Sequence, residues 1–132
     1  MAVDEPGGVA SMAGSVEPTG FQILIDRAEA GAPVCRVVGD LDLATVAVAR
    51  EELQPVILSG AEEAILDLGG VGFCDSAGLT LLLQLRSAAE GAGVRLKLAA
   101  LSSPVARVFE VTGALGLFQV YESAAEAQAE SA

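Results

Sequence analysis

The spacing of apolar residues divides the chain into predicted strands and helices. Alternating or continuous apolar residues predict five strands, at 21–25, 34–38, 64–68, 94–98 and 118–121. Apolar residues three and four positions apart predict three helices between the later strands, at about 42–58, 76–90 and 103–112. Each change of period is therefore interpreted as the boundary of an element.

The order of these elements predicts an α/β fold. A short polar turn over 26–33 joins the first two strands, so we expect them to pair antiparallel. The later strands alternate with helices, which is typical of right-handed crossovers between parallel strands. The run at 64–68 is almost entirely apolar and suits a central strand covered on both faces. We therefore expect a mostly parallel sheet of four to five strands, with an antiparallel first pair and helices packed against it.

The two ends of the chain lack a clear period. Residues 1–20 are rich in Gly, Pro, Ala and Ser and carry acidic but no basic residues, so we expect a disordered acidic tail. Residues 123–132 are rich in Ala and Glu and are expected to form a helix or a frayed tail. A single domain is expected over 21–122.

Several local features sharpen the expected boundaries. Asp42 is a candidate N-cap for the first helix, and Pro55 is expected to kink that helix or end it early. The glycine-bearing segment 69–72 is interpreted as a loop that leads to Asp75 and Ser76 at the start of the second helix. The apolar stripe expected for the third helix consists of Val105, Val108, Phe109 and Val111-Thr112.

Charge restricts the partners that the chain can bind. The formal net charge is −11, so nucleic acid phosphates and anionic membrane surfaces repel it. We expect a protein partner with a basic face, or a small molecule, and no nucleic acid. No apolar run approaches the roughly 18 residues that a membrane span needs, and no signal-peptide pattern is found. We therefore expect a cytoplasmic protein without membrane insertion, in which Cys35 and Cys74 are buried thiols.

Histidine is absent from the whole sequence, and this excludes several kinds of chemistry. A Ser-His-Asp triad, a histidine base and a histidine-ligated metal are all impossible. A serine nucleophile would need another base, and the chain has a single lysine, Lys97. We therefore expect no catalytic residue, no metal and no cofactor, and a protein that is not an enzyme.

The second helix has one clearly apolar side and one mixed side. At about 100° per residue, the apolar side holds Gly78, Leu81, Leu82, Leu85 and Ala89. The opposite side holds Ser76, Thr80, Leu83, Gln84 and Ser87, with Leu79 at its margin. Leu83 is thus either an isolated exposed leucine that needs no explanation or part of a partner-binding surface.

Ser76 allows three interpretations from the residues alone. It can cap the helix by accepting a hydrogen bond from a backbone N–H. It can act as a nucleophile, which the missing base disfavours. It can be phosphorylated, with the phosphate placed near free N–H groups at the positive end of the helix and in the middle of the proposed contact surface.

Three sequence blocks resemble a known family. They are Gly39-Asp40-Leu41-Asp42, Ile65-Leu66-Asp67-Leu68 and Phe73-Cys74-Asp75-Ser76-Ala77-Gly78-Leu79. Together they are similar to the STAS domain family, and more narrowly to bacterial anti-sigma factor antagonists. A later segment, Ser103-Pro104-x5-Glu110-x2-Gly113, is similar to the family's segment before its last strand. The resemblance covers about 21–122 and implies a single STAS-like domain.

The resemblance also implies a function. Members bind an anti-sigma factor that is often a serine kinase, and binding frees the sigma factor. The kinase phosphorylates the serine that corresponds to Ser76, and a serine phosphatase reverses the reaction. The resemblance implies a contact surface on the loop at 39–42 and on the helix that begins at Ser76, which agrees with the mixed side of that helix. The expected partner-binding residues are Asp40, Asp42, Asp75, Ser76, Leu79, Thr80 and Leu83. Ala77 departs from the family pattern, because a second Ser or Thr often occupies that position.

Other roles remain open. A STAS domain can also be a scaffold of a stress-signalling complex, or a partner subunit of a lipid or anion transport system. A small enzyme or nucleotide-binding protein is the alternative from another class. For that alternative, the glycines at 69–72 are weak support, because they lack the Lys and the Ser or Thr of a P-loop.

Overall fold

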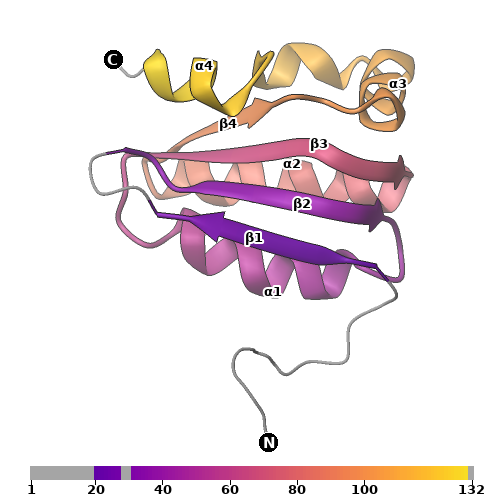
Figure 1. Cartoon of the computed structure of the whole chain (residues 1–132), viewed down its shortest axis with the longest axis horizontal. Helices are drawn as coiled ribbons and strands as arrows, with labels where there is room; N and C mark the ends of the chain where they lie inside the picture. The colour runs from indigo at the N-terminus through magenta and orange to yellow at the C-terminus, as the bar shows by residue number, and fades with distance from the viewer. Residues whose placement is uncertain (1–19, 28–30, 131–132) are drawn as a thin grey trace, which may run out of the picture.

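The computed structural model describes residues 20–27 and 31–130 (Figure 1). The predicted N-terminal tail, apart from Gly20, lies outside the described residues. The elements, in chain order, are β1 (Gln22–Asp26), β2 (Val34–Leu41), α1 (Val46–Ile57), β3 (Glu63–Cys74), α2 (Ser76–Gly91), β4 (Arg95–Ala99), α3 (Ser103–Thr112), the 3-10 helix η1 (Ala114–Leu117), β5 (Gln119–Tyr121) and α4 (Ala124–Ala129). In this part of the chain, no helix is both long enough and apolar enough to cross a membrane.

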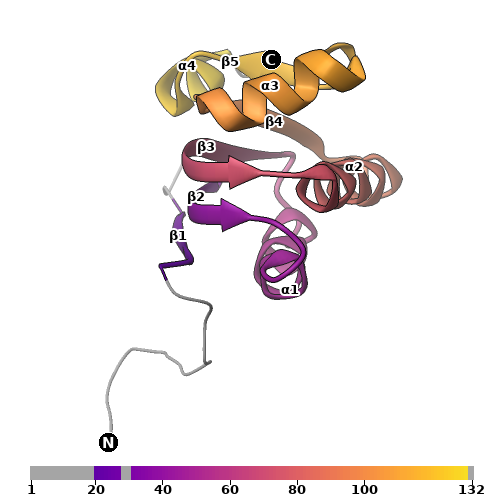
Figure 2. The same cartoon turned by 90° about the vertical axis from the view of Figure 1, so that its right-hand side faces the viewer.

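The strands form one sheet in the order β1-β2-β3-β4-β5. Strands β1 and β2 are antiparallel, whereas the other three neighbouring pairs are parallel. Figure 2 shows α1 and α2 on one side of the sheet and α4 on the other. The predicted α/β fold, with a mostly parallel sheet and an antiparallel first pair, is confirmed.

The main core lies between the sheet and α1, α2 and α3. It is aliphatic, with Leu66 and Leu68 of β3 and Leu81 of α2 fully buried in it. A smaller core under α4 contains Ile65, Ala99 and Ala127. Side chains alternate across a strand, so Leu66 and Ile65 enter different cores. Strand β3 is therefore buried on both faces along its first half, as its apolar run predicted.

Strand β3 is longer than predicted, because the segment 69–72 is part of the strand and not a loop. A Cβ atom at Gly70 would lie 2.9 Å from both the Val37 carbonyl oxygen and Val38 Cγ2. Glycine at this position therefore lets β2 approach β3 closely, and two register shifts in β2 accompany the contact. As a result, a single residue, Asp75, separates the end of β3 from α2.

The expectation that Asp42 caps the first helix is wrong. Helix α1 begins four residues later, at Val46, and Thr45 is its N-cap residue. Asp42 instead accepts a hydrogen bond at Oδ1 from the Ala44 amide, at 3.0 Å, as in an Asx turn. Thr45 Oγ1 donates to the Asp40 carbonyl oxygen at 2.8 Å and so closes the turn onto the end of β2.

The end of α1 and the buried side of α3 can also be compared with the prediction. Pro55 does not end α1 early, because the helix continues through it to Ile57, close to the predicted end at about 58. In α3, Val105 and Phe109 are buried and Val108 is partly buried, as predicted. Val111 is exposed, because it lies about 200° around the helix from Phe109.

Candidate functional site

The candidate site lies where β2 and β3 end and α2 begins. Asp40 is opposite Phe73 in the parallel pair, and Leu41 is opposite Cys74. The turn after β2 and the first turn of α2 therefore leave the sheet at the same edge (Figure 1). A Cβ atom at Gly78 would lie 2.6 Å from the Leu41 carbonyl oxygen. Only glycine thus allows α2 to pack this tightly against the end of β2.

Asp75, and not Ser76, caps helix α2. Its backbone is extended, and its Oδ1 accepts hydrogen bonds from the amides of Ala77 at 2.9 Å and Gly78 at 3.2 Å. Its carbonyl oxygen accepts from the Leu79 amide at 3.1 Å. Ser76 is the first residue of the helix, is exposed, and makes no side-chain hydrogen bond within the described residues. The interpretation of Ser76 as the cap is therefore wrong.

The occupied amides change what a phosphate on Ser76 would meet. The sequence led us to expect free N–H groups there, but those of Ala77 and Gly78 already bind the Asp75 carboxylate. A phosphate on Ser76 would therefore lie next to a carboxylate and would not be held by these two amides. It would remain a largely uncompensated negative charge on the surface.

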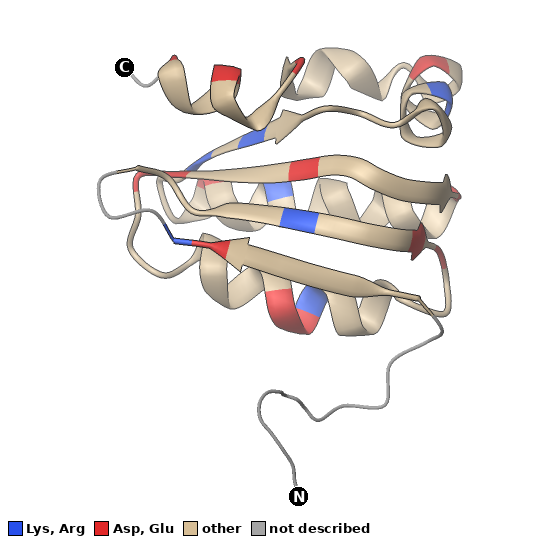
Figure 3. Ribbon diagram, viewed as in Figure 1, with Lys and Arg blue, Asp and Glu red and all other residues tan. Residues whose placement is uncertain are grey.

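The surroundings of Ser76 are acidic. Asp40 is exposed at the end of β2, while Asp42 and Asp75 are half-buried in the segments that follow β2 and β3. Figure 3 shows acidic positions at the carboxyl ends of β2 and β3. A protein that covers this edge must therefore present basic or hydrogen-bond-donating groups to it.

Two exposed apolar side chains accompany the carboxylates. Leu43, in the turn after β2, is 79% exposed, and Phe73, at the end of β3, is 49% exposed. Neither residue is among the contact residues expected from the sequence. Leu43 could not be recognised from the sequence, because it fell inside the helix predicted at about 42–58, whereas the structure places it in the turn before α1. Phe73 alternates with the buried Cys74, which predicts that it faces the other way.

The predicted outward position of Leu79 is wrong. Leu79 is 8% exposed and belongs to the main core, while Leu83 is half-buried and packs against that core. The projection assumed one buried side, but α2 packs against both the sheet and α1, whose Arg50 donates a hydrogen bond to Gln84. Of the predicted α2 residues at the site, Ser76 and Thr80 are exposed.

The nucleophilic groups of the chain do not contribute to this site. Burial raises the pKa of the Cys35 thiol to about 11, and burial together with the Asp75 charge raises the pKa of Cys74 to about 11. Both thiols are buried and unpaired, as predicted. Lys97 is buried beneath α4, where its Nζ donates to the carbonyl oxygens of Ala127 and Glu130. No lysine is thus available as a base for Ser76.

No group of three or more His, Cys, Asp or Glu side chains in the described residues is arranged to hold a metal ion. The chemistry that this site offers is recognition. An exposed hydroxyl that makes no hydrogen bond within the described residues lies next to Asp75 at the edge where β2 and β3 end, and a modification there alters charge without disturbing the core.

Comparisons with known proteins agree with the fold. The family model for the STAS domain matches residues 25–127. The anti-sigma-B factor antagonists of Staphylococcus aureus (strain NCTC 8325 / PS 47) and Staphylococcus epidermidis are 32% and 31% identical to the chain over 87 residues. Each match covers 66% of this chain and 81% of the relative.

Solved structures extend the agreement. The anti-sigma factor antagonist SpoIIAA in its unphosphorylated form is 27% identical, with a TM-score of 0.66 over 80% of this chain and 92% of that one. The phosphorylated form of the Bacillus cell fate determinant SpoIIAA is 26% identical, with a TM-score of 0.62 over 80% of this chain and 96% of that one. An anti-sigma factor antagonist from Mycobacterium paratuberculosis, at 20% identity and a TM-score of 0.74 over 85% and 95% of the two chains, supports the fold alone.

Proposed function

The chain belongs to the STAS domain family, and from this membership we propose that it is an anti-sigma factor antagonist controlled at Ser76. In this proposal it binds an anti-sigma factor that has serine kinase activity, and so frees a sigma factor. Phosphorylation of Ser76 ends the binding, and a serine phosphatase restores it. The protein acts in the cytoplasm as a binding module without catalytic activity.

The observation that carries the proposal is the state of the Ser76 hydroxyl. It is exposed at the start of α2, makes no hydrogen bond within the described residues, and is not needed to cap the helix, because Asp75 does so. A kinase can therefore bind and phosphorylate the Ser76 hydroxyl without unfolding the helix. A related structure, the phosphorylated form of SpoIIAA, has the same fold.

We assign the partner contact to a switch face, defined as Asp40, Asp42, Leu43, Phe73, Asp75, Ser76 and Thr80. Leu79 is left out because it is buried, and Leu83 because it is half-buried against the core. Leu43 and Phe73 supply exposed apolar area, and the carboxylates favour a partner with a basic surface.

Phosphorylation acts on this face through charge. A phosphate adds up to two negative charges beside Asp75, and the Ala77 and Gly78 amides are already occupied. An unpaired dianion buried under a partner costs several kcal/mol, and each 1.4 kcal/mol is about tenfold in affinity. The domain itself stays folded, because Ser76 is exposed.

The test is phosphorylation by the cognate anti-sigma kinase with ATP, followed by intact-mass analysis and peptide mapping. We expect one phosphate, on Ser76, and none on the Ser76→Ala variant. Ser87→Ala is the matched control, because it removes an exposed hydroxyl of the same helix outside the switch face and should leave the reaction unchanged. Absence of phosphate, or its persistence on Ser76→Ala, contradicts the proposal.

The same experiment bears on the alternative roles. A scaffold of a stress-signalling complex, or a partner subunit of a lipid or anion transport system, does not require that an anti-sigma factor be released when Ser76 is modified. A partner that binds the phosphorylated and unphosphorylated forms equally would favour one of these roles.

A further inference from the structure

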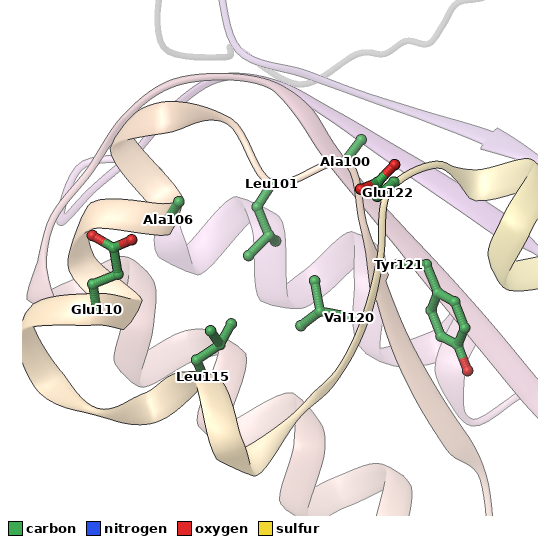
Figure 4. A pocket seen from close by; sticks show the side chains of 8 residues that line it. All are labelled: Ala100, Leu101, Ala106, Glu110, Leu115, Val120, Tyr121 and Glu122. Atoms are coloured by element: carbon green, nitrogen blue, oxygen red, sulfur yellow. The ribbon is translucent and has the colours of Figure 1, made fainter.

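A cavity of about 550 Å³ opens at the carboxyl ends of β4 and β5, outside the switch face. Its walls come from the connection between β4 and α3, from α3 itself, from η1, and from β5 with the residue after it (Figure 4). None of its lining residues belongs to the site described above. Glu110, which the sequence analysis noted within the Ser103–Gly113 segment, lies in one wall and has no role in the proposed switch.

The floor of this cavity is apolar and accessible. Leu101, Leu115 and Val120 come from three different segments, and Figure 4 shows their side chains gathered in the middle of the cavity. Leu115 is 45% exposed and Val120 is 37% exposed. This apolar surface is open to solvent, whereas the main core is covered by helices. Exposed apolar surface of this kind is typical of binding sites.

Two carboxylates flank the apolar floor. Figure 4 shows Glu110 of α3 on one side and Glu122, after β5, on the other. Both residues are exposed, and within the described residues neither forms an ion pair with Lys or Arg. The cavity lining contains no basic side chain. Its charge therefore complements cations and repels anions.

The wall beside Leu101 is held in a defined conformation. Ala100 has a φ of 58°, in the left-handed region, and its amide donates to the Tyr121 carbonyl oxygen at 2.9 Å. A Cβ atom at Gly69 of β3 would lie 3.3 Å from the Ala100 carbonyl oxygen, so β3 packs closely behind this turn. Non-glycine residues in this conformation are concentrated at functional sites. The cavity is thus formed before any ligand binds.

We propose that this cavity docks a basic amphipathic segment of a partner protein. One large apolar side chain of the segment enters between Leu101, Leu115 and Val120, and Lys or Arg on either side of it reaches Glu110 and Glu122. A peptide segment fits better than a free alkylamine, because it presents two cations on opposite sides of one apolar group. The docking is separate from the switch at Ser76 and does not depend on the phosphorylation proposed there.

The test is an NMR titration of the full chain with a short blocked peptide that has one leucine between arginines. We expect saturable shifts of the Leu101, Leu115 and Val120 methyl signals. The double variant Glu110→Gln/Glu122→Gln should weaken binding about fivefold, the value expected for two exposed ion pairs. The control is Glu51→Gln/Glu62→Gln, which makes the same charge change on α1 and before β3 and should bind like the unmodified chain.

Several outcomes would overturn the proposal. Shifts confined to the switch face would place the peptide elsewhere. Equal binding by the two double variants, or by a peptide with glutamates in place of arginines, would remove the role of the carboxylates. Binding of n-butylamine without binding of the peptide would indicate a small-molecule site instead.

Discussion

Asp75 and Ser76 are adjacent in the chain but have different roles. Asp75 provides the hydrogen bonds that start α2, and its position is fixed because it alone connects β3 to that helix. Ser76 provides an exposed hydroxyl that the fold does not use. This separation allows the chemical state of Ser76 to change while the helix start remains intact.

The separation predicts that substitutions of Asp75 and Ser76 differ in their effect on the free energy of unfolding. Asp75→Ala removes the cap and should lower the free energy of unfolding by about 1 kcal/mol. Ser76→Ala should change it by less than about 0.5 kcal/mol, as at other exposed positions. Asp75→Asn is the control, because it keeps a capping oxygen. Urea unfolding measures all three, and an equal loss for Asp75→Ala and Ser76→Ala would show that Ser76 is structural.

The buried thiols predict a loss of stability at alkaline pH. The pKa values of Cys35 and Cys74 are raised from 9.0 to about 11, so the unfolded state releases these protons first. Their contribution to the free energy of unfolding is complete below pH 9 and falls as the pH rises toward about 11. Urea unfolding gives the free energy of unfolding at about pH 8 and at about pH 10. Between these two pH values, this free energy should decrease less for the double variant Cys35→Ala/Cys74→Ala than for the unmodified chain. An equal decrease would contradict this assignment.

At the scale of elements, hydrogen bonds from the Lys97 side chain hold α4 against the sheet. Its side chain is buried, and its Nζ donates to the carbonyl oxygens of Ala127 at 2.9 Å and Glu130 at 3.0 Å. The same Nζ is 3.2 Å from Glu63 Oε1, and Glu63 also pairs with Arg95. A cation at the carboxyl end of a helix is favourable both to the free carbonyl groups and to the helix dipole.

Lys97→Met should therefore release α4. We expect a loss of about 3 kcal/mol in the free energy of unfolding, because one partner of a buried ion pair is removed. Hydrogen exchange should accelerate at the Ala127 and Glu130 amides and stay unchanged in the middle of α2. Arg107→Met, at an exposed position of α3, is the control. Unchanged protection of α4 in Lys97→Met would show that apolar packing alone holds this helix.

The elements also show what the sequence could and could not predict. The antiparallel first pair, the parallel direction of the later strands and the central position of β3 followed from apolar periods and connection lengths. The length of β3 did not, because glycines that usually indicate a loop here permit close strand contact at Gly70. The burial of Leu79 did not either, because a helical projection cannot tell that α1 covers a second side of α2.

At the scale of the whole molecule, charge and position act together. The net charge is −11, and acidic side chains border both the switch face and the cavity with Glu110 and Glu122. Both lie at the carboxyl ends of parallel strands, the edge where α/β sheets commonly bind ligands. The sequence led us to propose Ser76, Thr80 and the aspartates as contact residues, and the structure leaves Ser76, Thr80 and Asp40 exposed. The sequence did not point to Leu43 and Phe73, whose exposure depends on how the turn and the strand end are placed in space.

The central claim is that phosphorylation of Ser76 blocks the partner through charge and not through unfolding. The most direct test is calorimetric measurement of the Kd for the anti-sigma factor with unphosphorylated and Ser76-phosphorylated protein. The account predicts binding about a hundredfold weaker after phosphorylation, with the thermal midpoint of the isolated protein changed by only a few degrees. An unchanged Kd, or weaker binding accompanied by a large fall in the thermal midpoint, would contradict it.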